Sequence, residues 1–118
     1  MNNNNSGKLA EFLARMLMRC KGYRIICGNY VTGKGTRAGE IDFIARRGKT
    51  IAFVEVKKRQ NLEKAAYAIS EQQKRRIING AQAFLTKHPQ YAGYDMRFDA
   101  VLVKLPFSLK HIPNAWLS

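Results

Sequence analysis

Acidic residues are scarce in this chain of 118 residues, which carries 8 Asp and Glu against 21 Lys and Arg. The net charge of +13 predicts an anionic partner, with nucleic acid as the first candidate and an acidic membrane surface as the second. The alternative is a basic protein without a polyanionic partner, because net charge by itself describes solubility and non-specific binding.

Long apolar runs, a secretion signal and paired metal-binding cysteines are also missing from the sequence. No run approaches the ~20 apolar residues of a membrane-spanning helix, and no basic segment followed by an apolar one begins the chain. The two cysteines, Cys20 and Cys27, form no CxxC pair and have no histidine nearby, which argues against a zinc site. We therefore expect reduced thiols, a cytoplasmic protein and no membrane association.

Two further signatures of nucleotide or RNA binding are absent. Residues 28–39 form a glycine-rich basic segment that reads as a loop, but this segment lacks the GxxxxGK[ST] pattern of a phosphate-binding P-loop. The five tyrosines are scattered and build no stacking platform of the RNA-binding type. Neither His88 nor His111 has a paired acid or a spaced ligand in the sequence, so we expect neither to be catalytic.

The periodicity of the apolar residues predicts one α/β domain over residues 7–118, after a disordered tail of residues 1–6. Ser6 is a plausible N-cap for the first helix, and Ser70 with Gln73 fits a capping box that opens a second helix ending near Lys87. The expected fold is a small mixed sheet flanked by helices. Its expected helices are residues 8–20 (apolar stripe Leu9, Phe12, Leu13, Met16 and Leu17) and 70–87, and its expected strands are residues 23–27, 40–46, 50–57 and 97–105.

Three of the few acidic residues lie in or beside the predicted β-hairpin of residues 40–57. Glu40 and Asp42 belong to its first strand, and Glu55 lies in the second strand, two residues before Lys57. Carboxylates have poor strand propensity and are costly to bury without a partner. These acids therefore call for a partner, such as a metal ion or a lysine.

The register of this hairpin decides whether the acids meet. A two-residue turn at Arg47–Gly48 would place Asp42 opposite Phe53, with Asp42, Glu55 and Lys57 projecting from one side of a sheet covered on both faces. A three-residue turn would shift the register by one and separate the carboxylates. If they converge, their oxygen ligands suit Mg²⁺ or Mn²⁺, and the alternative is a structural ion pair inside the sheet.

At this point the sequence resembles a known family. The pattern Gly39-Glu40-Ile41-Asp42, followed by Phe53-Val54-Glu55-Val56-Lys57 and Arg59, is similar to the PD-(D/E)xK nuclease superfamily. More closely, it resembles the YraN-like family of predicted endonucleases, which are related to Holliday-junction resolvases. Further matches are Gly7 with Ala10-Glu11, Gly22-Tyr23-Arg24-Ile25, Lys74, Ala81, Phe84-Leu85 and Arg97-Phe98-Asp99.

The resemblance implies a restriction-endonuclease-like core and metal-dependent phosphodiester hydrolysis of DNA, with branched DNA as one candidate substrate. It implies Asp42 and Glu55 as metal ligands, the Val56 carbonyl as a third ligand, Lys57 as the catalytic lysine and Glu11 as an accessory acid. Lys58 departs from the small polar residue usual at its position, and the role of Glu40 is not assigned.

The basic residues around this site are candidates for contact with the DNA backbone, namely Lys34, Arg37, Arg59, Lys74 and Arg75. Resolvases of this fold usually pair as dimers, which makes a homodimer a candidate assembly, with Ile112 and Trp116 as the contact. Two other functions stay open: a non-catalytic nucleic-acid-binding module on a nuclease fold, and an RNA-processing factor.

Overall fold

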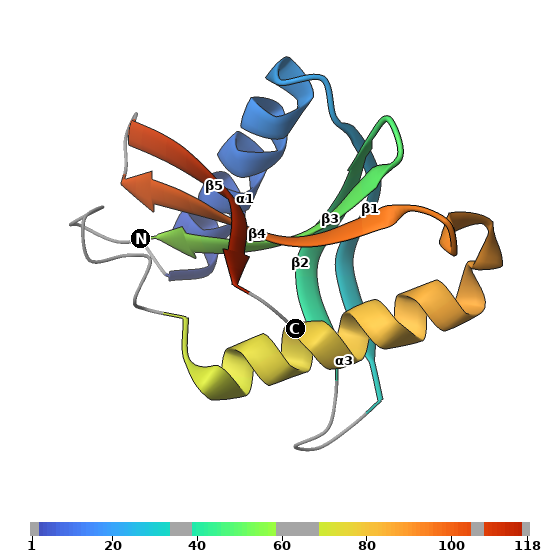
Figure 1. Cartoon of the computed structure of the whole chain (residues 1–118). Coiled ribbons are helices and arrows are strands. Elements are labelled where there is room, and N and C mark those ends of the chain that lie inside the picture. Colours follow the sequence, from blue (N-terminus) through green and yellow to red (C-terminus); the bar gives the residue numbers. More distant parts are fainter. Residues whose placement is uncertain (1–2, 34–38, 59–68, 105–107, 117–118) are drawn as a thin grey trace.

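The computed structural model describes residues 3–33, 39–58, 69–104 and 108–116, with the side chains of residues 3–6 left aside. Within these described ranges, two long helices and five strands follow one another (Figure 1). They are α1 (Asn3–Cys20), β1 (Arg24–Thr32), β2 (Gly39–Arg47), β3 (Thr50–Lys58), α3 (Glu71–Lys87), the 3-10 turn η2 (Pro89–Tyr91), β4 (Asp95–Lys104) and β5 (Ser108–Trp116).

The strands form one mixed sheet in the order β1-β2-β3-β4-β5. Neighbouring strands are antiparallel except β3 and β4, which run parallel. A parallel pair needs a crossover, and α3 lies on the connection from β3 to β4. The predicted α/β fold, a small mixed sheet flanked by helices, is confirmed, and it is consistent with a restriction-endonuclease-like core.

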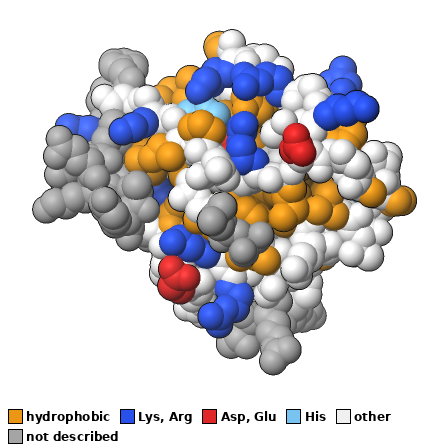
Figure 2. Space-filling model, viewed as in Figure 1, with side chains coloured by type: hydrophobic (Ala, Val, Ile, Leu, Met, Phe, Trp, Pro, Cys, Tyr) orange, Lys and Arg blue, Asp and Glu red, His pale blue; other side chains and the backbone are white. Residues whose placement is uncertain are grey.

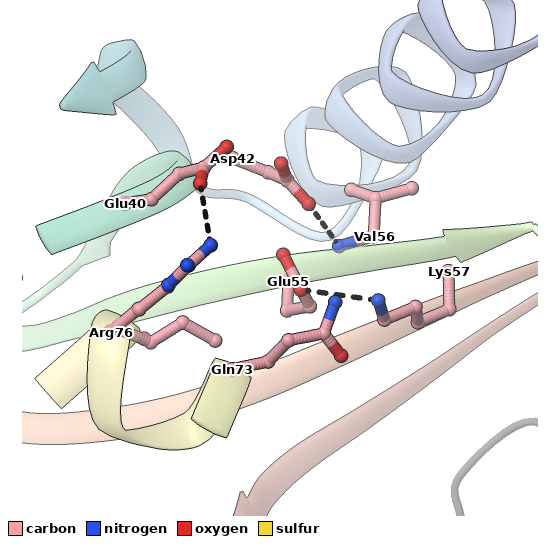
Figure 3. A pocket seen from close by; sticks show the side chains of 8 residues that line it. Glu40, Asp42, Glu55, Val56, Lys57, Gln73 and Arg76 are labelled. Carbon is pink, nitrogen blue, oxygen red and sulfur yellow. Dashed lines mark hydrogen bonds and ion pairs between the residues drawn. The ribbon is translucent and has the colours of Figure 1, made fainter. Parts of the chain in front are cut away.

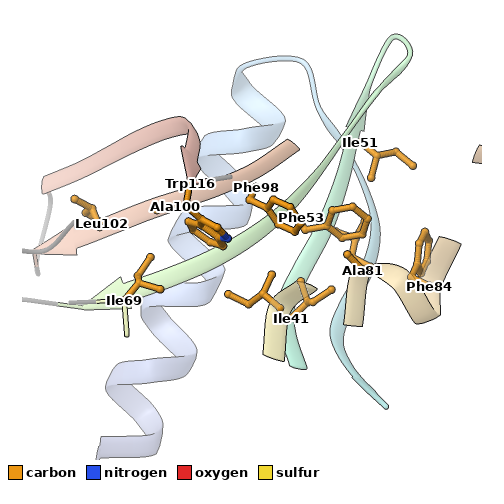
Figure 4. Close-up of a cluster of buried hydrophobic side chains, with 12 residues drawn as sticks. Ile41, Ile51, Phe53, Ile69, Ala81, Phe84, Phe98, Ala100, Leu102 and Trp116 are labelled. Atoms are coloured by element: carbon orange, nitrogen blue, oxygen red, sulfur yellow. The ribbon is translucent and has the colours of Figure 1, made fainter. Parts of the chain in front are cut away.

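Each face of the sheet has its own apolar cluster. On one face α3 packs through Ile77, Ala81 and Phe84 against strand residues such as Phe53 and Trp116 (Figure 4). On the other face α1 packs against the strands through Ala10, Ala14 and Met18. Because β3 lies between β2 and β4 with helices on both faces, five consecutive residues from Ile51 to Glu55 are buried.

The buried face of α1 differs from the predicted stripe. Leu9, Phe12 and Met16 are exposed, whereas small residues such as Ala10 and Ala14 contact the sheet. Small side chains let a helix approach a sheet closely, and this close approach selects a different face from the one with the largest apolar residues. The rotation also brings Glu11, which follows Ala10, toward the sheet.

The ends of several elements also differ from the sequence prediction. The helix α1 begins at Asn3, so Ser6 lies within it rather than capping it, and residues 3–6 are helical instead of tail. An already formed helix can extend over Asn residues because each costs only ~0.7 kcal/mol relative to Ala. Strand β1 continues to Thr32 through residues predicted as loop.

Strand β5 was not predicted at all. It pairs antiparallel with β4, and its Trp116 stacks on Phe98 with ring centroids 5.6 Å apart. Trp116 is only 8% exposed because it packs within its own chain, and a homodimer through Ile112 and Trp116 stays a prediction. The capping box of α3 is confirmed, because the Ser70 hydroxyl accepts from the Gln73 N–H at 3.1 Å and the Ser70 N–H donates to the Gln73 side chain at 3.3 Å.

Two glycines allow α3 to contact the start of β2. A Cβ on Gly39 would lie 2.5 Å from the backbone N and Cα of Gly80, a distance that no side chain can accommodate. Gly80 therefore allows close helix–sheet packing, although glycine weakens a helix relative to alanine by ~1 kcal/mol. This contact fixes α3 beside the strand that carries Glu40 and Asp42.

Candidate active site

The candidate site lies where β2 and β3 separate. Arg47 pairs with Thr50 across a turn at Gly48–Lys49, and the ladder runs as far as Phe43 and Val54. The sequence predicts Lys49 opposite Arg46, but Ile51 occupies that place. This shift of two residues preserves which face of the hairpin each residue is on, so the carboxylates are not separated.

The alternation of side chains between the two faces of the sheet is interrupted in β2 at Asp42. Ile41 packs in the α3-side cluster and Phe43 in the α1-side cluster, although alternate strand residues normally share a face. On the neighbouring strand β1, Asn29 lies opposite this point and has a positive φ of 51°. The Asp42 carboxylate therefore enters the gap between the strands, where its Oδ2 accepts the Val56 N–H at 2.7 Å (Figure 3).

Glu55 and Lys57 project from β3 beside Asp42. They are two residues apart on one strand and so share a face, and the Lys57 Nζ lies 3.5 Å from the Glu55 Oε2. Both side chains are largely buried, with 11% and 12% of their surfaces exposed for Lys57 and Glu55 respectively. Lys57 thus pairs with Glu55, and both line the hollow that Asp42 also lines.

Burial and the neighbouring Glu55 oppose the ionisation of Asp42. Burial in the sheet, followed by the hydrogen bond with Glu55 and the charge of Glu55, raises the pKa of Asp42 to about 8. At neutral pH this raised pKa favours the protonated form of Asp42. A divalent cation bound here would favour the ionised form of Asp42 and so displace that proton.

A third acid reaches this point from the other side of the sheet. Burial raises the pKa of Glu11, and the nearby Asp42 carboxyl raises it further. One hollow on the α3 side and one on the α1 side both include Asp42 and Val56 in their walls. The first is lined by Glu40, Asp42, Glu55, Val56, Lys57, Gln73, Arg76 and Ile77, and the second by Gly7, Lys8, Ala10, Glu11, Asp42, Val56 and Lys58.

The oxygen donors beside Asp42 are enough for a hard divalent ion only if water completes its coordination. Within the described ranges, no group of three or more Asp, Glu, His or Cys side chains is arranged as a ready metal cluster. The available donors are two carboxylates, Asp42 and Glu55, and the Val56 carbonyl, which points to the same side of β3 as the N–H bound by Asp42. Mg²⁺ commonly binds one or two carboxylates and keeps several waters, so this set is chemically adequate.

None of the five residues predicted to contact DNA is found lining the hollow beside Asp42 in the described part of the chain. Lys34, Arg37 and Arg59 lie outside the described residues. Lys74 forms an ion pair with Glu71 at 3.3 Å, and neither Lys74 nor the exposed Arg75 lines the hollow beside Asp42. The residues that α3 does present there are Gln73 and Arg76.

Gln73 and Arg76 were missed as site residues, although the sequence contains their signal. Gln73 precedes Arg76 by three residues and the buried Ile77 by four, and helix neighbours at these spacings lie on one side of α3. The unassigned Glu40 lines the same hollow, with its Oε2 4.0 Å from the Arg76 Nη1.

A second buried acid, Asp99, is held by hydrogen bonds within the protein and has a structural role. Its carboxylate accepts two hydrogen bonds from Arg97 and one from His111, each 2.7 Å long, and one from the Asn114 N–H at 3.0 Å. Burial by itself would raise the pKa of Asp99, but these hydrogen bonds outweigh it and hold the pKa below its usual value. His111 thus has the paired acid that the sequence did not reveal, and the cluster joins β4 to β5.

Comparison with known proteins gives consistent relatives along nearly the whole chain. The sequence model of the uncharacterised protein family UPF0102 matches residues 10–103. A UPF0102 protein of Paramagnetospirillum magneticum is 47% identical over 93% of this chain and 85% of its own length. A UPF0102 protein of Nitrobacter winogradskyi is 46% identical over 95% of this chain and 92% of its own length.

Membrane insertion through a helix finds no support in the described residues. None of their helices combines the length and the apolar character that crossing a bilayer requires.

Proposed function

This chain belongs to the uncharacterised UPF0102 family, the YraN-like group, and we propose that it is a Mg²⁺- or Mn²⁺-dependent endonuclease that cleaves DNA. The observation that carries this proposal is that Asp42, Glu55 and Lys57 line one hollow, where Asp42 binds the Val56 N–H at 2.7 Å and the Lys57 Nζ lies 3.5 Å from Glu55. Such an arrangement offers a divalent ion two carboxylates and places an ammonium group beside them. The net charge of +13 supports a polyanionic substrate.

Each residue of the site has a distinct task in this proposal. Asp42, Glu55 and the Val56 carbonyl would hold the ion, which would activate a water and offset charge on the scissile phosphate. The Lys57 ammonium, already 3.5 Å from Glu55, would orient the attacking water or stabilise the charge that develops on the phosphate. Glu11, whose pKa is raised by burial and by Asp42, can hold or accept a proton at the edge of the site.

The second candidate is a nucleic-acid-binding module that does not cut. The Glu55–Lys57 ion pair favours it, because this pair offsets the Glu55 charge without any metal. Such a module would bind DNA in a salt-sensitive manner whether or not a divalent ion is present.

A cleavage assay over linear, flapped and four-way-junction DNA, and over RNA, tests the proposal. We expect DNA products in Mn²⁺ or Mg²⁺, none in EDTA, and a loss of about a hundredfold or more in rate for Glu55→Gln. Glu71→Gln is the matched control, since Glu71 has a side chain that is 85% exposed. DNA binding without products in every metal would instead identify the non-catalytic module, and cleavage of RNA alone would support the RNA-processing alternative.

A further inference from the structure

Arg76 is poorly paired for a guanidinium that lines a hollow. Its Nε is buried and, among the described residues, has no hydrogen-bond partner. Its ion pair with Glu40 is 4.0 Å long, and the two side chains are 37% and 56% exposed. Exposed pairs of this length contribute little to stability, typically ~0–1 kcal/mol.

Other arginines of the chain are engaged differently. Arg97 donates two hydrogen bonds to the buried Asp99, Arg46 donates to the Tyr94 hydroxyl at 3.1 Å, and Arg47 donates to the Lys21 carbonyl at 3.0 Å. A buried N–H without a partner costs free energy. The Nε of Arg76 is therefore a donor that no described residue uses and that an oxygen-bearing ligand could satisfy.

The position of Arg76 defines the chemistry of that ligand. Its side chain enters the hollow that also contains Asp42, Glu55 and Lys57 (Figure 3). A guanidinium presents Nε–H and Nη–H donors as a planar fork that matches two oxygens of a phosphate. Gln73 lies one helical turn earlier and faces the same hollow with its amide nitrogen toward Glu55 and Lys57 (Figure 3).

We propose that Arg76 binds a backbone phosphate of the DNA next to the scissile one, and that Glu40 holds Arg76 in the absence of DNA. This inference rests on the proposed function, because it takes DNA to occupy this hollow. Incoming phosphate would replace the loose Glu40 contact with a two-point hydrogen bond and would also satisfy the buried Nε. Glu40, the acid of the Gly39–Asp42 motif without an assigned role, thereby acts as the counter-charge of Arg76.

Fluorescence anisotropy with a flapped DNA duplex in EDTA tests this inference separately from cleavage. Arg76→Ala is expected to weaken binding by about tenfold to a hundredfold, the effect of losing a hydrogen-bonded charge contact. Arg75→Ala removes the same charge one residue earlier from an exposed position, and it should weaken binding by no more than about threefold. Arg76→Lys keeps the charge without the fork and should fall between the two; it also serves if Arg76→Ala does not fold.

Combining the substitutions tests the role of Glu40. We expect Glu40→Gln to tighten binding by about threefold in the natural chain and to have a smaller effect when Arg76 is already Ala. Equal losses for Arg75→Ala and Arg76→Ala would overturn the inference, as would an equal effect of Glu40→Gln in both backgrounds. If Mn²⁺-dependent cleavage persists, the proposed nuclease function survives those outcomes. If no DNA is cleaved, a measured coupling between Arg76 and Glu40 in DNA binding still stands.

Discussion

At the residue scale, the raised pKa of Asp42 makes stability depend on pH. Burial and the Glu55 neighbour raise the folded-state pKa of Asp42 from 3.8 to about 8. The folded chain thus binds the Asp42 proton more tightly than the unfolded chain. The stabilisation is complete below pH 3.8 and is lost as the pH rises through about 8.

Asp42→Asn should remove this dependence, because an amide stays neutral and can donate to Glu55 in place of the carboxyl. We expect the variant to match the natural chain in urea midpoint near pH 5 and to exceed it near pH 9, both measured in EDTA. An equal difference between the two proteins at both pH values would contradict this account. The same variant should lose cleavage, so stability and activity would change in opposite directions.

Asp99 should respond to pH in the opposite sense. Its hydrogen bonds with His111 and Arg97 outweigh burial and lower its pKa. The resulting stabilisation is present above the unfolded-state pKa and is lost as the pH falls through the folded one.

Removing the Asp99 charge should destabilise the chain strongly. Asp99→Ala leaves Arg97 and His111 without their shared partner, and we expect a loss of about 3–5 kcal/mol in the free energy of unfolding at pH 7. Asp95→Asn is the control on the same strand, where the exposed side chain should change the value by less than about 0.5 kcal/mol. Denaturant titration gives both numbers, and a small effect at Asp99 would mean that its hydrogen bonds add little.

At the scale of elements, the contact between α3 and β2 depends on two glycines. Gly39→Ala would place its Cβ 2.5 Å from the Gly80 backbone, and we expect a destabilisation of about 3 kcal/mol. Gly7→Ala is the opposite case, since a Cβ there meets nothing within 4 Å and helix α1 should gain ~0.5–1 kcal/mol. Thermal midpoints should therefore move in opposite directions; a rise for Gly39→Ala would show that the helix can shift.

The sequence predicted well those elements whose structure is determined by residues close together in the chain. The capping box at Ser70 and Gln73 and the apolar side of α3 are set by residues close together in the chain. The hairpin was found, but its turn was placed one residue early. Gly48 has the positive φ of 60° while Lys49 does not, which suits a turn with glycine first.

The elements that were missed depend on distant partners. Strand β5 contains Pro113 and has no alternating pattern, yet Asp99 of β4 holds it through His111 and the Asn114 N–H. The facing of α1 likewise follows from contact with the sheet rather than from its largest apolar residues. At the site, the sequence predicted Asp42, Glu55 and Lys57 together, but the change of facing at Asp42 that brings in Glu11 could not be inferred from strand alternation.

At the scale of the whole molecule, the excess of positive charge should govern encounter with nucleic acid. On the face seen in Figure 2, blue Lys and Arg side chains greatly outnumber red acids, and the acids of the site lie in hollows between the sheet and its helices. We expect DNA affinity to fall at least tenfold between 50 and 200 mM salt, because counterions are released on binding. Affinity that is independent of salt would contradict this prediction.

The central claim, that Asp42 and Glu55 form a divalent-metal site, is tested most directly by titrating Mn²⁺ into the protein in a calorimeter. The account predicts a single bound Mn²⁺ per chain for the natural protein and for the Glu71→Gln control. It predicts none for a folded chain carrying both Asp42→Asn and Glu55→Gln. Undetectable binding by the natural chain, or equal binding by the double variant, would contradict it.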